Sequence, residues 1–255
     1  MQKKAIVIGA TSGIGLEVAK LLAAKGWKVG IAGRRLDRLE QTAAETGGIA
    51  AYRQIDVTQE DAAEKLRELI DETGGMDLYF HSSGIGWQNE ELDAGKEIQT
   101  VETNGVGFTR MVDAAFEWFK GTRSSRGSSG SRSSRGSRGH IACITSIAGT
   151  RGLGASPSYS ATKRFQQHYL ECLDQLARMQ HLPINITDIR PGFVKTDLIA
   201  GSHYPMQLRA EDVARLIVRA IEHRKAVVTI DWKYRMLVAL WRLIPRWMWV
   251  RMRVR

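Results

Sequence analysis

The sequence predicts an α/β fold: a doubly wound, seven-stranded parallel sheet with helices on both faces and a helical tail at the C-terminus. The main observation is that short apolar runs alternate with helical patterns along most of the chain, which is typical of a parallel sheet covered on both faces. The right-handed crossover rule then makes the sheet doubly wound. A length of 255 residues with 43% hydrophobic residues suits one large domain.

The predicted elements follow one another in a regular order. The strands are expected at the apolar runs AIVIG, WKVGIAG, IAAYRQI, DLYFHSSG, HIACITS, INITDIRPG and AVVTI, because these runs alternate with helical patterns. The helices between them are expected at 14–25, 36–46, 59–73, a long stretch to about 120, a stretch that starts at Pro157, and 209–224. Residues 1–231 are therefore predicted to form one domain and residues 232–255 a basic, Trp-rich tail.

The net charge of +10 is concentrated in two segments, and the first is Gly121–Gly139. Its sequence, GTRSSRGSSGSRSSRGSRG, holds five arginines and no acid. It has no apolar side chain to bury, so we expect a flexible surface loop. Arginine with serine and glycine also resembles disordered RNA-binding segments, which leaves RNA binding as an alternative. The segment has no aromatic residue for base stacking, and we do not expect nucleic acid as a partner.

The second basic segment is the tail after Asp231, which holds seven basic residues, no acid and four of the seven tryptophans. At about 100° per residue, Arg235, Arg242 and Arg246 form one stripe and aliphatic side chains cover much of the rest. This pattern predicts an interfacial helix on an anionic membrane surface, kinked or ended by Pro245. A subunit interface and a flap over the substrate cleft are competing interpretations.

Other sequence features bear on location and metal binding. Cys143 and Cys172 are expected in apolar surroundings, and two thiols in a chain of this length make no disulfide framework, which fits a reducing cytosol. The N-terminus lacks a secretory pattern, and no apolar run reaches the roughly 18 residues that span a bilayer. We expect a cytoplasmic protein that is peripheral to the membrane. No cluster has metal-ligand spacing, so no metal is expected.

The first predicted strand runs into the glycine-rich sequence GATSGIG, which contains Gly9, Gly13 and Gly15. Glycines allow a tight turn and let the backbone approach a phosphate, while a helix N-terminus supplies free amides. The spacing is GxxxGxG and not GxGxxG. Its position between a strand and a helix nevertheless predicts a Rossmann-type dinucleotide-binding turn.

The end of the second strand is expected to select the cofactor. A carboxylate at this place would bind the adenosine ribose hydroxyls, but the chain has Arg34 and Arg35 there, and no acid until Asp37. Guanidinium groups are suited to bidentate contacts with phosphate. The sequence therefore predicts NADP(H). The alternative is that both arginines merely begin a solvated helix.

Tyr159 and Lys163 stand four residues apart in SPSYSATKRF, and this spacing puts both side chains on one face of a helix. Ser156 and Pro157 suit the N-cap and first helical position. A free phenol has a pKa near 10. An ammonium about 4 Å away is worth roughly 4 kcal/mol at an effective dielectric of 20, which would lower that pKa by about three. Lys163 would thus make Tyr159 usable as an acid or base near neutral pH.

Several motifs together resemble the short-chain dehydrogenase/reductase family, in its single-domain branch of about 250 residues. They are GATSGIG, IDVT at 55–58, Asn104, Ser146 in ITSIAG, YSATK and PGFVKTD, and the resemblance covers residue 3 to about residue 230. The resemblance implies hydride transfer between a nicotinamide and a carbonyl or alcohol, and it implies a homo-oligomer.

Catalytic roles are implied for four residues. Tyr159 would protonate the carbonyl oxygen or, in the reverse direction, act as the base. Ser146 would donate a hydrogen bond to the substrate oxygen. Lys163 would also bind the nicotinamide ribose, and Asn104 would anchor a water chain to that lysine.

The resemblance also implies which residues contact the cofactor. Asp56 would meet the adenine amino group, and Val194 and Thr196 would lie in the segment that contacts the carboxamide. The full set is Gly9, Thr11, Ser12, Gly13, Ile14, Gly15, Arg34, Arg35, Asp56, Val57, Ser82, Ser83, Gly84, Tyr159, Lys163, Pro191, Gly192, Val194 and Thr196. The following stretch, DLIAGSHYPM, is expected to be a substrate lid.

One motif departs from the family. Where the family usually has NNAG after the fourth strand, this chain has HSSG, from His81 to Gly84. Gly84 keeps the close approach to the cofactor, but the usual asparagine hydrogen bonds are changed. We expect a structural role for His81 at the strand end, with a catalytic acid as the alternative.

These observations combine into one functional hypothesis, an NADP(H)-dependent oxidoreductase that reduces a ketone or aldehyde or oxidises the matching alcohol. The tail favours an apolar or lipid-like substrate. A protein of another class, an NADPH-binding sensor or scaffold without turnover, is the alternative.

Overall fold

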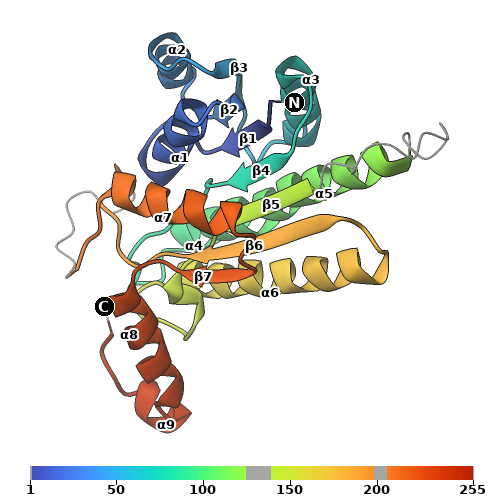
Figure 1. Cartoon of the computed structure of the whole chain (residues 1–255). Coiled ribbons are helices and arrows are strands. Elements are labelled where there is room, and N and C mark those ends of the chain that lie inside the picture. The colour runs from blue at the N-terminus through green and yellow to red at the C-terminus, as the bar shows by residue number, and fades with distance from the viewer. Residues whose placement is uncertain (1, 125–138, 198–205, 255) are drawn as a thin grey trace.

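The computed structural model describes residues 2–124, 139–197 and 206–254. Within them, seven parallel strands form one sheet in the order β3-β2-β1-β4-β5-β6-β7 (Figure 1). The strands are β1 (Lys4–Ile8), β2 (Lys28–Gly33), β3 (Ile49–Gln54), β4 (Leu78–His81), β5 (Gly139–Ile144), β6 (Ile184–Arg190) and β7 (Val227–Thr229). The predicted doubly wound parallel sheet is confirmed.

The helices lie on both sides of this sheet (Figure 1). They are α1 (Gly13–Ala24), α2 (Leu36–Glu45), α3 (Ala62–Thr73), α4 (Ala94–Val101), α5 (Phe108–Ser124), α6 (Pro157–Met179), α7 (Ala210–Glu222), α8 (Trp232–Leu243) and α9 (Arg246–Trp249). A π-helical turn, η1 (Glu102–Gly107), joins α4 to α5, and a 3₁₀ turn, η2 (Ile147–Gly149), follows β5.

The helix start that differs most from the prediction is that of α3. α3 begins at Ala62 and not at Gln59, because the preceding residues form a tight turn. Asp56 accepts hydrogen bonds from the backbone N–H and hydroxyl of Thr58, at 3.0 and 2.8 Å, and its carbonyl accepts from the N–H of Gln59 at 3.1 Å. An Asx-type turn competes with helix formation in this way.

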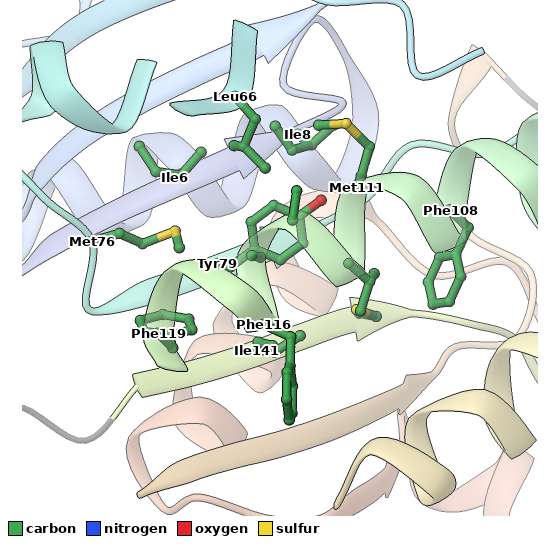
Figure 2. Close-up of a cluster of buried hydrophobic side chains, with 14 of the residues drawn as sticks. Ile6, Ile8, Leu66, Met76, Tyr79, Phe108, Met111, Phe116, Phe119 and Ile141 are labelled. Carbon is green, nitrogen blue, oxygen red and sulfur yellow. The ribbon is translucent and has the colours of Figure 1, made fainter. Parts of the chain in front are cut away.

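Consecutive strand residues point into two separate cores. In β4, Tyr79 belongs to the cluster under α3, α5 and α6, while Phe80 belongs to the cluster under α1 and α7. This follows from the two-residue period of a strand. Figure 2 shows the first cluster, in which Tyr79 lies among side chains from β1, α3, α5 and β5. Both faces of the sheet are therefore buried, which explains the continuous apolar runs in the sequence.

The strand order reverses beside β1. Ile8 at the end of β1 pairs with Ala32 of β2 on one side and with His81 of β4 on the other. The loops that leave β1 and β4 therefore lie next to each other at the carboxyl end of the sheet. This topological switch point is where open α/β sheets bind their ligands.

Some predictions fall outside the described residues or need correction. Residues 125–138 of the Ser/Arg/Gly segment and residues 198–205 of the predicted lid are not described. Cys143 is buried as expected, but Cys172 is exposed, because it lies on the solvent side of α6. No helix of the described chain is long and apolar enough to cross a membrane.

Candidate active site

The glycine-rich loop is folded as a close-packed cradle at the N-terminus of α1. Gly9 has a φ of +82°, and a Cβ on it would lie 2.7 Å from the backbone N of Ser83. A Cβ on Gly15 would lie 2.2 Å from the carbonyl oxygen of Gly9. Only glycine fits these positions. Ser12 stands at the N-cap of α1 without a side-chain cap hydrogen bond, so the cap side chain does not bind the first amides of the helix.

Arg35 brings its guanidinium group onto this loop. It donates hydrogen bonds to the hydroxyl of Thr11 at 3.0 and 3.2 Å and to the hydroxyl of Ser12 at 2.6 Å. It also pairs with Asp197 at 3.2 Å. The hydrogen bond from Ser12 and the contact with Arg35 lower the pKa of the Asp197 carboxyl. Arg34 is exposed, and its carbonyl accepts a hydrogen bond from Gln54 at 2.8 Å.

The segment after β6 reaches back to the same loop. A Cβ on Gly13 would lie 2.9 Å from the methyl group of Thr196. Val194 is buried and bridges to Leu208, and the carbonyl of Pro191 accepts from the N–H of Ile147 at 3.1 Å. Two predicted cofactor segments that lie far apart in the sequence, GATSGIG and PGFVKTD, therefore touch.

The predicted helix carries Tyr159 and Lys163 on one face, with the Lys163 ammonium 5.7 Å from the centroid of the Tyr159 ring. Ser156 occupies the N-cap of α6 but makes no side-chain cap hydrogen bond. The Glu97 carboxylate accepts from the N–H of Ser158 at 2.9 Å instead. An acidic side chain from α4 thus stabilises the start of the helix that carries the site.

Lys163 is almost completely buried, with 4% of its surface exposed. Its ammonium donates to the carbonyl of Ile144 at 3.2 Å and to Oε1 of Gln166 at 3.0 Å. Burial lowers its pKa from 10.5 to about 8, against the opposing influence of Cys143 and Asp188. A Cβ on Gly84 would lie 3.4 Å from this ammonium, so the glycine of the HSSG motif leaves the space that Lys163 occupies.

Asn104 lies in the π-helical turn η1 and is fully buried. Its side chain binds both backbone groups of Ile85, at 2.7 and 2.9 Å, and donates to the hydroxyl of Thr162 at 3.2 Å. Its carbonyl accepts from Nε2 of Gln166 at 2.9 Å. Turns of this kind are frequent at functional sites. Asn104 therefore fixes the loop after β4 against α6.

Gln166 joins two of the predicted catalytic residues and was missed in the sequence. Its amide bridges the carbonyl of Asn104 and the ammonium of Lys163. The sequence does hold one signal for Gln166, because it stands three residues after Lys163 and therefore on the same helix face. Gly86 was also missed, and a Cβ there would lie 2.3 Å from the Tyr159 ring.

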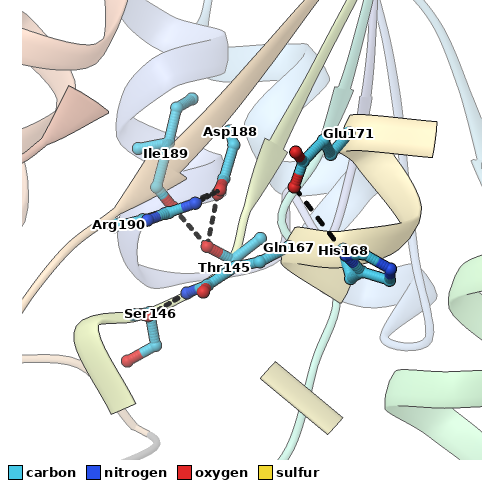
Figure 3. A network of polar contacts seen from close by, with 8 residues as sticks. All are labelled: Thr145, Ser146, Gln167, His168, Glu171, Asp188, Ile189 and Arg190. Carbon is cyan, nitrogen blue, oxygen red and sulfur yellow. Dashed lines mark hydrogen bonds and ion pairs between the residues drawn. The ribbon is translucent and has the colours of Figure 1, made fainter. Parts of the chain in front are cut away.

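Ser146 follows β5 and is buried. Its hydroxyl accepts from the N–H of Ala148 at 3.1 Å, and its carbonyl accepts from Gln167 at 2.7 Å. Figure 3 shows the polar network beside it, in which Thr145 donates to Asp188 at 2.5 Å and Arg190 pairs with the same carboxylate at 2.6 Å. This network ties together the ends of β5 and β6 that flank Ser146.

His81 is fully buried, and its Nδ1 lies 2.8 Å from the hydroxyl of Tyr79. Burial, followed by the charge of Lys163, lowers its pKa from 6.5 to about 3. The ring also packs edge-on against Phe108, with centroids 5.2 Å apart. The ring is neutral near pH 7, and its contacts are with buried side chains of β4 and α5, which supports the structural role.

Asp56 and Val57, which are predicted to lie near the adenine, follow the end of β3. The turn that Asp56 forms with Thr58 orients its carboxylate. Val57 is buried, and its carbonyl accepts from Arg110 at 2.9 Å. No group of three or more potential metal ligands occurs within the described residues.

Comparisons with known proteins identify the family. The family model described as short chain dehydrogenase matches residues 3–204. An uncharacterized oxidoreductase of Myxococcus xanthus is 30% identical over 95% of this chain and 93% of its own length. This chain belongs to the short-chain dehydrogenase/reductase family and is an oxidoreductase of that family.

Solved structures share the fold. A 3-ketoacyl-(acyl-carrier-protein) reductase from Brucella melitensis, complexed with NADH, has a TM-score of 0.76 at 23% identity, over 90% of this chain and 96% of its own. An actinorhodin polyketide ketoreductase variant with NADPH has a TM-score of 0.73 at 24% identity, over 90% of this chain and 95% of its own. Nicotinamide cofactors of both kinds are therefore bound by proteins of this fold.

Proposed function

We propose that this protein is an NADP(H)-dependent oxidoreductase that transfers hydride between the nicotinamide and a carbonyl or alcohol substrate. The observation that carries the proposal is the pair Tyr159 and Lys163 on one helix face, with the buried Lys163 linked through Gln166 to Asn104. A charged lysine is costly to bury. A chemical role for that charge accounts for its place there.

The residues present fit a dinucleotide. The tight approach of Gly9 and Gly15 and the free amides at the start of α1 suit its pyrophosphate. The guanidinium of Arg35, which already lies on Thr11 and Ser12, suits a phosphate on the adenosine ribose. This placement supports NADP(H) over NAD(H). Asp56 and Val57 are proposed at the adenine, and Val194 and Thr196 at the carboxamide.

The bound cofactor would supply or accept the hydride, and the chain's own residues would handle the proton. In the direction of reduction, the Tyr159 hydroxyl gives its proton to the substrate oxygen and becomes a phenolate. The Lys163 ammonium stabilises that phenolate. The Ser146 hydroxyl donates a hydrogen bond to the substrate oxygen and holds it near Tyr159. In the reverse direction the phenolate takes the proton of the alcohol.

The identity of the substrate stays a prediction, because it depends on a lid that is mostly outside the described residues. We propose an apolar or lipid-like carbonyl compound, since a Trp-rich tail packs against Gly192 and the segment that leads to Tyr159. The predicted homo-oligomer also stays a prediction.

The test is a panel of ketones and aldehydes with NADPH, followed at the nicotinamide absorbance, for the wild-type protein and Tyr159→Phe. We expect the variant to lose about 10²- to 10⁴-fold in kcat/KM, the usual contribution of a general acid. Its affinity for NADPH, measured by fluorescence titration, should stay within about tenfold, because removal of one hydroxyl costs at most about one hydrogen bond of roughly 0.5–1.5 kcal/mol.

Two results would contradict the proposal. A wild-type protein that binds NADPH but turns over no carbonyl in the panel would support the sensor or scaffold interpretation. A Tyr159→Phe variant with unchanged turnover would remove Tyr159 from the chemistry.

A further inference from the structure

The tail is fixed to the body of the protein by one side of α8. Tyr234 is fully buried, and its hydroxyl accepts from the N–H of Phe193 at 3.1 Å and donates to the carbonyl of Met206 at 3.0 Å. A Cβ on Gly192 would lie 2.2 Å from its ring. Val238, one turn further along, is also buried. This packing sets which side of α8 faces outward.

A second set of contacts holds the end of α8 and α9. Arg151 donates to the carbonyls of Trp241 at 3.1 Å and Ile244, and its guanidinium lies 5.5 Å from the centroid of the Trp249 ring. The Trp249 indole donates to the carbonyl of Gly152 at 2.7 Å. The tail therefore has a defined orientation, and in Figure 1 it projects from the α/β body.

The outward side of α8 is also apolar. Its large side chains are Trp232, Met236, Leu240 and Leu243, which are 56%, 57%, 59% and 78% exposed. At about 100° per residue they lie within an arc of about 80°, opposite Tyr234 and Val238. Trp247 and Val250, at 63% and 60% exposed, extend this surface past Pro245. A helix on a water-facing surface usually carries polar residues on that side.

Positive charge borders this apolar arc on both sides. By the same helical geometry, Arg235 and Arg242 lie on one flank of the arc and Lys233 on the other, and all three are exposed. The sequence from residue 232 to the end contains seven basic residues and no acid. Any partner that covers the apolar arc therefore meets positive charge on both sides of it.

The positive charge on both sides of the arc distinguishes a second copy of this chain from another kind of partner. A two-fold dimer through this surface would place the same patch of each chain against itself, and like charges would then face each other without a carboxylate from the tail to pair them. An anionic bilayer suits both features. Apolar side chains can enter the boundary of the acyl chains, tryptophan prefers the headgroup level, and arginine can reach lipid phosphates.

We propose that the outward surface of α8 and α9 docks on an anionic lipid bilayer, with the chain lying on the membrane and not crossing it. Arg151 and Gly152 lie between Ser146 and Tyr159 in the sequence, and Tyr234 packs on Gly192. Docking would thus hold the candidate site close to the lipid surface. The proposal does not depend on the proposed oxidoreductase activity.

The test is flotation of the full chain with vesicles made of equal parts phosphatidylcholine and phosphatidylglycerol, and with vesicles of phosphatidylcholine alone. We expect the chain to float with the anionic vesicles, to float much less with the neutral ones, and to be released as salt is raised. Substitution of Arg235 and Arg242 by glutamine should weaken the partition constant on the order of thirty-fold, since each basic residue near such a surface is worth about 1 kcal/mol.

A matched pair of triple variants tests the apolar part. The docking variant is Met236→Gln, Leu240→Gln and Leu243→Gln, and the control is Ile98→Gln, Met179→Gln and Leu216→Gln, three exposed apolar residues on α4, α6 and α7. We expect the docking variant to lose flotation and the control to keep it. Both should keep the thermal midpoint of the wild type, because the substituted side chains face solvent.

Other outcomes would overturn the proposal. Equal flotation of the docking variant and the control would show that this surface does not bind lipid. Equal flotation with neutral and anionic vesicles would show that the positive charge does not select an anionic bilayer. Absence of flotation, together with a dimer in light scattering that the docking variant alone abolishes, would assign the surface to a second copy of the chain.

Discussion

At the scale of single residues, Gln166 is the position where the structure adds most to the sequence. Its Oε1 accepts from the Lys163 ammonium at 3.0 Å, and a hydrogen bond to the charged form of a group favours that form. Gln166 should therefore raise the pKa of Lys163 above the value that burial alone would give. It is a positioning residue, because it acts through Lys163.

This role can be tested with two substitutions that act in opposite directions. In carbonyl reduction, kcat/KM should decline at alkaline pH as Lys163 loses its proton, which happens near pH 8 in the unliganded protein. We expect Gln166→Leu to move this decline to lower pH by about one pH unit, and Gln166→Glu to move it to higher pH. A uniform loss of rate with an unmoved midpoint would assign Gln166 a structural role only.

The residues predicted from the sequence and the residues missed differ in a physical way. Tyr159 and Lys163 are related by helical spacing, and the glycines of GATSGIG by one turn, so local sequence brings each set together. Gln166 links Lys163 of its own helix to the carbonyl of Asn104 in η1, and Gly86 lies against a side chain of α6. A Cβ on Gly86 would meet the Tyr159 ring, but these two residues are 73 positions apart in the sequence, and no local pattern signals that contact.

At the scale of elements, the segment after β6 supplies a carboxylate that pairs with the guanidinium group of Arg35. Asp197 pairs with Arg35 on the glycine loop, and both side chains are largely exposed, at 69% and 45%. A phosphate on the adenosine ribose would compete with this carboxylate for the same guanidinium. An exposed ion pair is worth about 0.2–1 kcal/mol, so the competition should be modest.

We therefore expect Asp197→Asn to lower the Kd of NADPH roughly two- to fivefold and to leave the Kd of NADH unchanged. The measurement is a fluorescence titration with both nucleotides at low salt. In an Arg35→Gln background the Asp197→Asn substitution should have no effect on either nucleotide. An equal gain for NADH would mean that Asp197 acts on the common part of the cofactor and not on the phosphate.

Element boundaries show where sequence patterns fail. The long helix expected up to about residue 120 contains the π-helical turn η1 around Asn104, where the backbone hydrogen bonds shift to the wider π-helical register. The predicted end of the tail helix at Pro245 is confirmed, since α8 ends at Leu243 and α9 starts at Arg246. A proline marks the end of a helix in the sequence itself, whereas a π-turn depends on tertiary contacts.

At the scale of the whole molecule, the parallel sheet was predictable because both of its faces are buried. Strands such as β1, β2 and β4 are then short, largely apolar runs that are visible without any partner. The place of the tail was not predictable in this way. The Trp249 indole binds the carbonyl of Gly152 across 97 positions of sequence, and an amphipathic pattern does not say which surface receives it.

The buried Lys163 should also affect the stability of the entire chain. Its pKa is about 8 in the folded protein and 10.5 ordinarily, so above pH 8 the unfolded chain binds this proton more tightly than the folded protein does. The free energy of unfolding should therefore rise with pH between about 8 and 10.5. Below about pH 8 Lys163 is protonated in both states, and this stabilising contribution is absent. The difference between the two pKa values corresponds to about 3 kcal/mol in the free energy of unfolding.

The contribution can be isolated by comparison with Lys163→Met. Urea unfolding of both proteins from pH 7 to pH 10 should show the free energy of unfolding of the wild type rising relative to the variant, because other alkaline titrations are common to both and cancel. The exposed Lys96, changed to Met, is the control and should give a difference that does not depend on pH. If the Lys163→Met difference is equally flat, burial does not lower the pKa of Lys163. In that case the folded protein carries the ammonium at no cost, and the argument that its charge is kept for chemistry loses its physical basis.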